Sequence, residues 1–144
     1  MKAIITIGAF VCLINAVIIA QQQGVKGQLY LVTGNQMPSP DRKHIPRKGV
    51  VREIYIYELT NVAEVDKEDG FYKKVFTKFV KSQFSKADGT FKIKLPPGKY
   101  SLFVKENKGL HANLFDSENN ISPFTVERKT YTWMTVTIDY AATY

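Results

Sequence analysis

Apolar residues beyond Gln23 recur at nearly every second position, which is the spacing of β-strands that bury one face. The alternating rows fall in five segments, 25–31, 51–59, 91–95, 100–105 and 131–140. These segments are rich in Val, Ile, Thr, Tyr and Phe, side chains that pack well on a pleated surface. Segment 51–59 is apolar on both faces, so we expect it in the interior of a sheet. The pattern predicts an all-β domain.

Turn residues separate these segments where the chain must reverse. Asp88-Gly89 is typical of a two-residue hairpin turn, because glycine accepts a positive φ. Pro96-Pro97-Gly98 predicts a second tight turn, since proline presets φ and glycine takes the left-handed position. A third polar break lies at 116–120. Six or seven short strands with this punctuation predict a β-sandwich.

The stretch from Phe71 to Phe84 departs from simple alternation. Its apolar residues repeat with helical spacing, and lysines occupy the opposite face. The Asp88-Gly89 turn needs a strand just upstream, so we expect residues 78–85 to form one. For residues 71–77 the pattern leaves helix and strand open.

The first 20 residues have the layout of a secretory signal peptide. An apolar run from Ala3 to Ile19 follows a basic start, and the small residue Ala20 precedes a polar segment. We expect a signal peptide over 1–20, one domain over 21–144, and a secreted or periplasmic location. An apolar run of about 17 residues is also the lower limit for a membrane span, so a retained anchor is the alternative. After cleavage we expect no span to remain.

Cysteine content and charge narrow the classes of function. The only cysteine, Cys12, lies in the predicted signal peptide, so we expect a domain without disulfides, thiolate nucleophile or cysteine-based metal site. Removing Lys2 from the 20 basic side chains leaves 19 against 13 acidic ones, a net charge of +6. The lysines are spread along the chain, which is typical of a solvated surface with guarded strand edges. An anionic envelope lipid or acidic glycan is the alternative interpretation, and we expect no nucleic-acid binding.

Residues Lys86 to Leu102 combine an Asp-Gly turn, an aromatic residue, alternating apolar residues, a Leu-Pro-x-Gly turn and a tyrosine two residues later. This run closely resembles the carboxypeptidase regulatory-like domains, and residues 24–29 are similar to the start of such domains. The resemblance implies a transthyretin-like (prealbumin-like), Ig-like Greek-key sandwich of about seven strands, acting as a non-catalytic envelope module. In physical terms the run predicts two successive hairpins with five residues facing one core: Phe91, Ile93, Leu95, Tyr100 and Leu102.

The sequence contains few residues in patterns typical of catalytic or metal-binding sites. The two histidines, His44 and His111, do not have the spacing of metal ligands. The ending, residues 139–144, lacks the Tyr-Arg-Gly-Ser sequence of the transthyretin-like hydroxyisourate hydrolases, so a hydrolase is a remote alternative. Asp116 to Asn120 offers oxygens that suit calcium, but a polar turn is the simpler interpretation. We expect no enzymatic activity, no metal and no cofactor.

Aromatic residues supply the best material for a binding hypothesis. Tyr131 and Trp133 are two residues apart, so they should project from one face of the last strand. Flat rings with polar tips suit contact with sugars or peptides, whereas cross-strand packing inside the sandwich is the alternative. A solvent-facing row of Trp133 and Tyr131 would favour binding, and buried rings would favour packing. The long loop 34–49 contributes further candidate contacts: Arg42, His44 and Arg47.

Three tyrosines, Tyr30, Tyr55 and Tyr57, would extend this aromatic surface if their strands neighbour the last one. The sequence therefore predicts an exported, non-catalytic module that binds a glycan or protein partner in the cell envelope. A structural or accessory subunit of an envelope assembly is the alternative.

Overall fold

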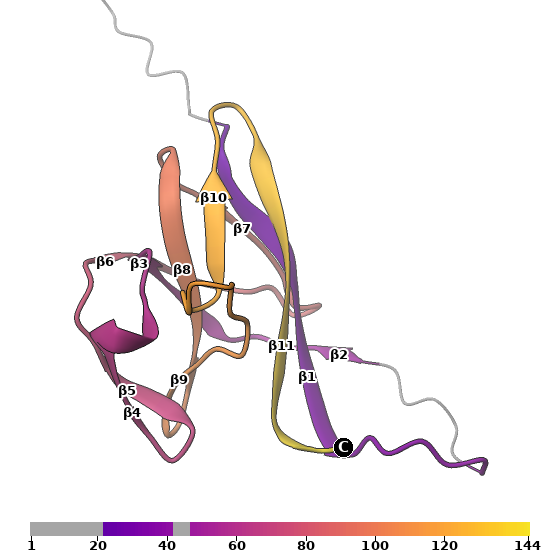
Figure 1. Ribbon diagram of the computed structural model, residues 1–144. Coiled ribbons are helices and arrows are strands. Elements are labelled where there is room, and N and C mark those ends of the chain that lie inside the picture. Colours follow the sequence, from indigo (N-terminus) through magenta and orange to yellow (C-terminus); the bar gives the residue numbers. More distant parts are fainter. Residues whose placement is uncertain (1–21, 42–46) are drawn as a thin grey trace, which may run out of the picture.

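Two β-sheets face each other across a shared apolar core (Figure 1). The computed structural model describes residues 22–41 and 47–144, so the predicted signal peptide over 1–20 lies outside the described residues. The expectation of an all-β sandwich is confirmed, because every regular element described is a strand apart from a 3₁₀ turn at Val62–Glu64. In the described ranges we find no helix with the length and apolarity that crossing a bilayer requires.

Eleven strands are described, against the seven or so expected, because several are short pieces of two to four residues. The strands are β1 (Gly24–Asn35), β2 (Lys48–Gly49), β3 (Glu53–Glu58), β4 (Val65–Glu68), β5 (Phe71–Val75), β6 (Phe79–Phe84), β7 (Thr90–Lys94), β8 (Gly98–Glu106), β9 (Gly109–His111), β10 (Pro123–Val126) and β11 (Tyr131–Thr143).

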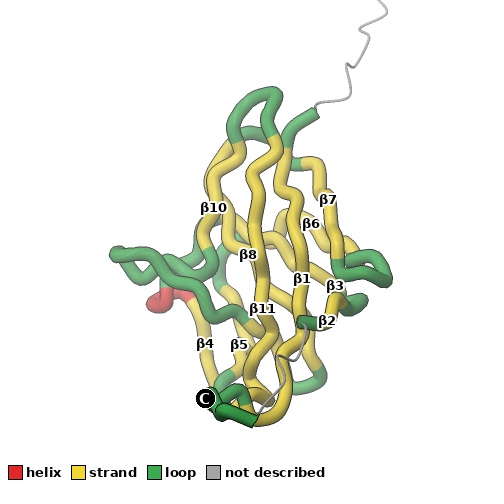
Figure 2. The backbone as a smooth tube through the Cα atoms, turned by 90° about the vertical axis from the view of Figure 1, so that its right-hand side faces the viewer, coloured by secondary structure: helices red, strands yellow, loops and turns green. Residues whose placement is uncertain are grey.

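The four-stranded sheet is built around β1. One edge of β1 pairs with β11 in parallel, and the other pairs first with β7 and then with β2, both antiparallel. Figure 2 looks onto this sheet, where β1 and β11 run side by side. The seven-stranded sheet has the order β4-β5-β9-β8-β3-β6, and β10 also pairs with β8. β3 is thus an interior strand, as its two apolar faces predicted.

The core between the sheets is made of alternate residues from both layers. Ile54 and Ile56 of β3 are fully buried and lie in one cluster with Val136 and Ile138 of β11. Burying one such side chain stabilises the fold by about 1.5–3 kcal/mol. The residues of the 86–102 run that were expected to share a core do so: Phe91, Ile93, Leu95, Tyr100 and Leu102.

The two predicted hairpins are wrong in one respect, because each turn carries the chain from one sheet to the other. The Asp88-Gly89 turn itself forms: Gly89 has a φ of 84°, and the Thr90 amide donates to Asp88 Oδ1 at 3.0 Å. Its arms β6 and β7 belong to different sheets, and so do β7 and β8, the arms of the second turn. This crossing lets the apolar residues of the two arms face each other across the core instead of lying side by side.

Side chains bridge the first of these crossings. Gln83 Nε2 on β6 donates to the carbonyl of Lys92 on β7 at 2.7 Å, and Lys81 Nζ reaches the carbonyl of Lys94 at 3.4 Å. These bonds satisfy carbonyls on the edge of β7 that does not pair with β1. The edge is therefore covered without a strand partner.

Residues 71–77, for which helix and strand were both open, form strand β5 followed by a turn, and the strand expected over 78–85 is confirmed as β6. Phe71 and Tyr72 are consecutive residues of β5 and are both buried, because each face of this strand is covered. Two buried neighbours followed by a turn imitate the spacing of an amphipathic helix.

A second apolar cluster lies on the outer face of the seven-stranded sheet. Phe103, Tyr72 and Ile121 form its buried centre. Ile121 belongs to the segment after β9, residues 112–122, which we call the covering loop. Its amide donates to the carbonyl of Thr60 at 2.8 Å, and this bond fixes the loop over the sheet. Phe103 lies between the core residues Leu102 and Val104, so strand alternation alone leaves it on the outward face and gives no indication of this cover.

Candidate functional site

The outer face of the four-stranded sheet carries the two aromatic residues predicted to share a face. Met134, Val136 and Ile138 are buried in the core, so the alternate residues of β11 point away from it. Tyr131 is half-buried and Trp133 is 60 % exposed. Exposure of both rings was the observation expected to favour binding over internal packing. Trp133 meets this expectation, and the half-buried Tyr131 meets it only in part.

Strand register places lysines next to these rings. Lys26 on β1 pairs with Trp133 on one side and with Lys92 on the other, so an indole and two ammonium groups form one row across three strands. Lys92 Nζ lies 4.5 Å from the centre of the Tyr131 ring, a cation–π contact that holds the lysine over the face. The indole Nε1 donates to Thr135 Oγ1 at 3.3 Å. We call this surface the lysine–aromatic face: Lys26, Tyr30, Lys92, Lys94, Tyr131 and Trp133.

The lysine–aromatic face has no acidic side chain at its outward strand positions. Those positions on β1, β7 and the first part of β11 are Lys26, Gln28, Tyr30, Thr90, Lys92, Lys94, Tyr131, Trp133, Thr135 and Thr137. Three positive charges therefore lie among hydroxyls, one amide and aromatic rings, and the nearby Asp88 carboxylate, in the turn before β7, accepts from the Thr90 hydroxyl at 2.6 Å. Such a surface attracts anions and polar ligands that also offer a flat apolar patch.

Of the other residues predicted to contact a ligand, some lie on the lysine–aromatic face and others do not. Arg47 lies 5.9 Å above the ring of Tyr30, so it extends the lysine–aromatic face toward β2. Arg42 and His44 fall outside the described residues. Tyr55 and Tyr57 belong to β3 of the opposite sheet and do not join the face.

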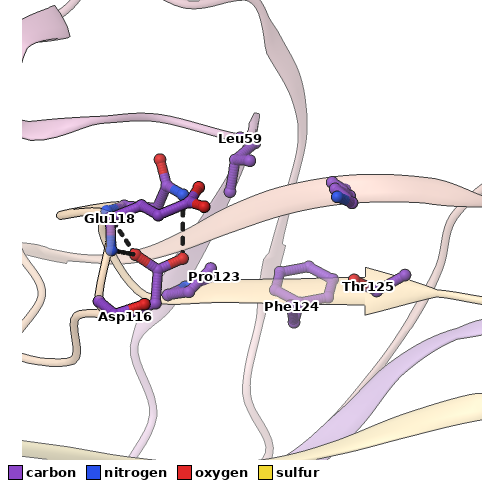
Figure 3. A pocket seen from close by; sticks show the side chains of 9 residues that line it. Leu59, Asp116, Glu118, Pro123, Phe124 and Thr125 are labelled. Atoms are coloured by element: carbon purple, nitrogen blue, oxygen red, sulfur yellow. Dashed lines mark hydrogen bonds between the residues drawn. The ribbon is translucent and has the colours of Figure 1, made fainter.

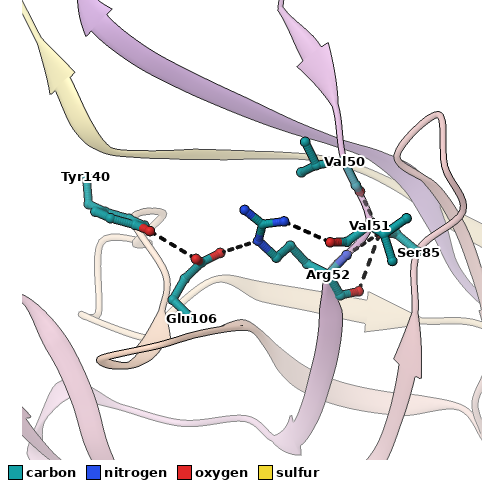
Figure 4. Close-up of polar contacts among 6 residues, drawn as sticks. All are labelled: Val50, Val51, Arg52, Ser85, Glu106 and Tyr140. Carbon is teal, nitrogen blue, oxygen red and sulfur yellow. Dashed lines mark hydrogen bonds and ion pairs between the residues drawn. The ribbon is translucent and has the colours of Figure 1, made fainter.

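A cluster of charged and polar side chains joins the two sheets at one end of the core (Figure 4). Arg52 Nε and Tyr140 hydroxyl both donate to the Glu106 carboxylate at 3.0 Å, one to each oxygen. His111 Nε2 lies 3.9 Å from Asp139 Oδ1. Asp139 and Tyr140 sit where β11 has an extra residue relative to β1, and such a bulge redirects side chains.

This cluster contains histidine, arginine and acidic side chains, the residue types that a hydrolase would use, but here they contact one another and link the two sheets. His111 is 6 % exposed, and its Nε2 has no hydrogen-bond partner among the described residues. Burial lowers the pKa of His111, and the negative charge of Asp139 and a hydrogen bond to the Thr137 backbone only partly oppose this effect. The Glu106 carboxylate is occupied by Arg52 and Tyr140, and neither His111 nor Asp139 lines either of the two depressions described below.

The polar segment that suggested calcium forms a turn beside a depression of about 500 Å³ (Figure 3). Asp116 Oδ1 accepts from the amides of Glu118 and Asn120 at 2.9 and 2.8 Å, and Oδ2 accepts from the Asn120 side chain at 2.9 Å. Hydrogen bonds from Asn120 are the main reason that the pKa of Asp116 is lowered. Both carboxylate oxygens of Asp116 therefore accept hydrogen bonds from within residues 116–120 and stabilise this turn. Residues 22–41 and 47–144 contain no group of three His, Cys, Asp or Glu side chains placed to hold a metal.

Sequence reasoning missed a second depression, of about 430 Å³, on the outer surface of the seven-stranded sheet. Tyr55 and Tyr57 of β3, Tyr72 of β5 and the turn at 105–110 line it. These segments are far apart in the sequence and meet only because β3, β8, β9 and β5 are neighbours in the sheet. The alternation of Tyr55 and Tyr57 with buried isoleucines was the only available signal.

Comparison with known proteins adds no assignment. No family model, no curated protein and no solved structure matches this chain, so its function must be argued from its own geometry.

Proposed function

We propose that this chain is an exported, non-catalytic β-sandwich module that binds a glycan of the cell envelope through the lysine–aromatic face. The single observation that carries the proposal is Trp133, the only tryptophan of the chain, which is 60 % exposed among outward strand positions of β1, β7 and residues 131–137 that carry no acidic side chain.

The chemistry of the face matches a sugar in three ways. An indole or phenol ring packs against the C–H face of a pyranose while its polar edge stays in water. Lysine ammonium groups beside Trp133 and Tyr131 donate hydrogen bonds to sugar hydroxyls or carboxylates. Tryptophan and tyrosine dominate the energetics of binding surfaces because they bury much area with few rotatable bonds. A protein ligand is the other partner class that such rings would suit.

Residues outside the face support the rest of the proposal. The layout of residues 1–20 supports export to the periplasm or beyond. The resemblance of residues 86–102 to carboxypeptidase regulatory-like domains, with their transthyretin-like Greek-key topology, supports a non-catalytic envelope role. Its residues pack as a folding motif in the core and carry no reactive group.

The test uses the single tryptophan as a built-in reporter. We titrate the purified protein with a panel of acidic and neutral envelope oligosaccharides and follow tryptophan emission and calorimetric heat. We expect a saturable emission change with at least one acidic oligosaccharide. Trp133→Ala should weaken the calorimetric affinity about tenfold or more.

Phe84→Ala is the matched control, because Phe84 is 62 % exposed but lies on β6 of the other sheet. We expect this variant to bind like the parent protein. An affinity that falls equally in both variants, or no binding across the panel, would contradict the proposal.

A structural or accessory subunit is the second candidate, and β11 is the observation in its favour. This strand has 13 residues, and among the described strands it pairs only with β1. The Thr137 carbonyl on its other edge accepts from Asn113 at 3.1 Å, but no described strand pairs with that edge, which leaves room for a strand of another chain. Native purification distinguishes the candidates: an accessory subunit should co-purify in a larger assembly, whereas a clean monomer would argue against that role.

A further inference from the structure

The depression lined by Tyr55, Tyr57 and Tyr72, which we call the tyrosine hollow, lies on the opposite sheet from the lysine–aromatic face. In Figure 1 its strands, β3, β5 and β9, lie on the far side of the molecule from β1 and β11. Its volume of about 430 Å³ falls within the range of small-ligand sites.

Packing against one buried ring fixes the walls of the hollow. Tyr57 and Tyr72 each meet Phe103 edge-on, with ring centres 5.5 Å apart and planes at 86° and 77°. The ring centres of Tyr55 and Tyr57 also lie 5.6 and 5.5 Å from that of Phe79. Because Phe103 is fully buried, Tyr57 and Tyr72 are held in place before any ligand arrives, which lowers the entropy lost on binding.

The hydroxyl groups of the three tyrosines make no hydrogen bond with a residue of the described ranges. None of these oxygens is a buried atom without a partner, although the residue Tyr72 is only 2 % exposed. Burial raises the pKa of Tyr57 and Tyr72, so both phenols stay protonated at neutral pH and can donate as well as accept. The hollow therefore offers three hydrogen-bonding groups on a rigid aromatic frame.

Lysines around the hollow have no carboxylate to neutralise them. Lys105 Nζ lies 5.9 Å from the Tyr55 ring, and Lys73 Nζ donates to the Lys108 carbonyl, which ties the β8–β9 turn to β5. None of these lysines forms an ion pair with a described residue. The acidic residue at the rim, Glu106, turns its carboxylate away to Arg52 and Tyr140 (Figure 4). The hollow is thus locally positive.

We propose that the tyrosine hollow binds a carboxylated sugar, such as a uronic acid unit. The C–H face of the sugar would pack on the tyrosine rings, its hydroxyls would meet the free phenols, and its carboxylate would pair with Lys105 and Lys108. This site goes beyond the proposed function, because it shares no residue with the lysine–aromatic face and stands independently of it.

The test is a ¹⁵N–¹H NMR titration of the purified protein with trigalacturonate and with its trimethyl ester, in which each negatively charged carboxylate is replaced by a neutral methyl ester. We expect saturable shifts in the amides of 105–110, β3 and β5, and an affinity for the ester at least tenfold weaker. Lys105→Gln should weaken acid binding about tenfold, and Tyr57→Phe, which removes only a hydroxyl, about three- to tenfold. Lys94→Gln is the matched control on the other sheet and should change nothing at the hollow.

Three outcomes would overturn the site. Equal affinity for the acid and the ester would show that the carboxylates are not recognised. If inorganic sulfate, added at the same concentration of negative charge, shifts the same amides, the hollow binds anions in general and has no role for a sugar acid. Loss of these shifts in Trp133→Ala would move the binding to the lysine–aromatic face, which supports the proposed function and rejects the hollow. Titration with the galacturonate monomer shows whether the ligand is a free sugar acid or one unit of a chain. An affinity equal to that for the trimer indicates a free sugar acid, and a weaker affinity indicates a unit within a chain. Either result supports the site.

Discussion

Trp133 on β11 and Phe103 on β8 both point away from the core between the sheets, yet Trp133 is 60 % exposed and Phe103 is fully buried. The strands around them do not explain the difference, since each residue alternates with buried apolar neighbours. The covering loop, residues 112–122, explains it. The loop places Ile121 beside Phe103 and Tyr72 on the outside of the seven-stranded sheet. Nothing described covers Trp133 in the same way.

The contrast separates stabilising aromatic residues from those left free for contact. On the seven-stranded sheet Phe103 and Tyr72 are buried in a second core, and Tyr55 and Tyr57 pack against it partly buried. On the four-stranded sheet the rings share the surface with lysines and contribute little packing. Exposed apolar surface of this kind marks places where another molecule is contacted.

The largest expected effect tests this contrast through stability. Phe103→Ala should lower the free energy of unfolding by about 3–5 kcal/mol, because it leaves a cavity in the second core. Trp133→Ala should change that free energy by no more than about 0.5 kcal/mol, the usual range for an exposed position. Urea unfolding followed by far-UV circular dichroism measures both, since one variant has no tryptophan.

Ile121→Ala serves as the control for the covering loop in that comparison. Ile121 and Phe103 are in one buried cluster, so their losses should be non-additive in the double variant by about 0.5–3 kcal/mol. Strict additivity, or a loss for Trp133→Ala as large as that for Phe103→Ala, would mean that the two faces do not differ as described.

A smaller effect concerns pH, because His111 directly precedes the covering loop. Asp139 and Tyr140 of β11, Glu106 of β8, Lys67 of β4 and Phe71 of β5 surround its ring. Burial lowers its pKa in the folded protein, so the unfolded chain binds the proton more readily. This contribution to stability is complete above the unfolded value near 6.5 and is lost as the pH falls from there toward the lower folded pKa.

Unfolding free energies at pH 7.5 and 5.0 measure this dependence, with His111→Gln as the variant that does not titrate. We expect the parent protein to lose more stability than His111→Gln on acidification. The protection factors of amides in the covering loop, which compare the measured exchange rate with the intrinsic rate at the same pH, should be lower at pH 5.0 than at pH 7.5, while Trp133 emission stays constant. The same pH slope in both proteins would show that His111 is not the titrating group.

Local periodicity was enough to predict β1, β3, β7, β8 and β11 and the shared direction of Tyr131 and Trp133, because strand geometry fixes the alternation of side chains. It could not show which sheet each arm of a turn would join, since that choice depends on pairing with β1, distant in the sequence. The same limit hid the covering loop and the tyrosine hollow. Ile121 gave no signal that it would bury Phe103, and Tyr57 and Tyr72 meet only after four strands have assembled.

The smallest expected effect tests whether the lysines of the lysine–aromatic face are positioned or merely solvated. Lys92 lies over the Tyr131 ring, whereas Lys94 on the same strand makes no ring contact with a described residue. Lys92→Gln should therefore lower the free energy of unfolding by about 0.5–1 kcal/mol, and Lys94→Gln should leave it unchanged. Urea unfolding at low and high salt measures the pair, and the Lys92 effect should persist at high salt because a ring contact is screened less than a surface ion pair. Equal losses in the two variants would mean that the lysines only set the net charge. A loss of stability in Lys92→Gln alone would mean that the Lys92 ammonium group is positioned over the Tyr131 ring before a ligand binds.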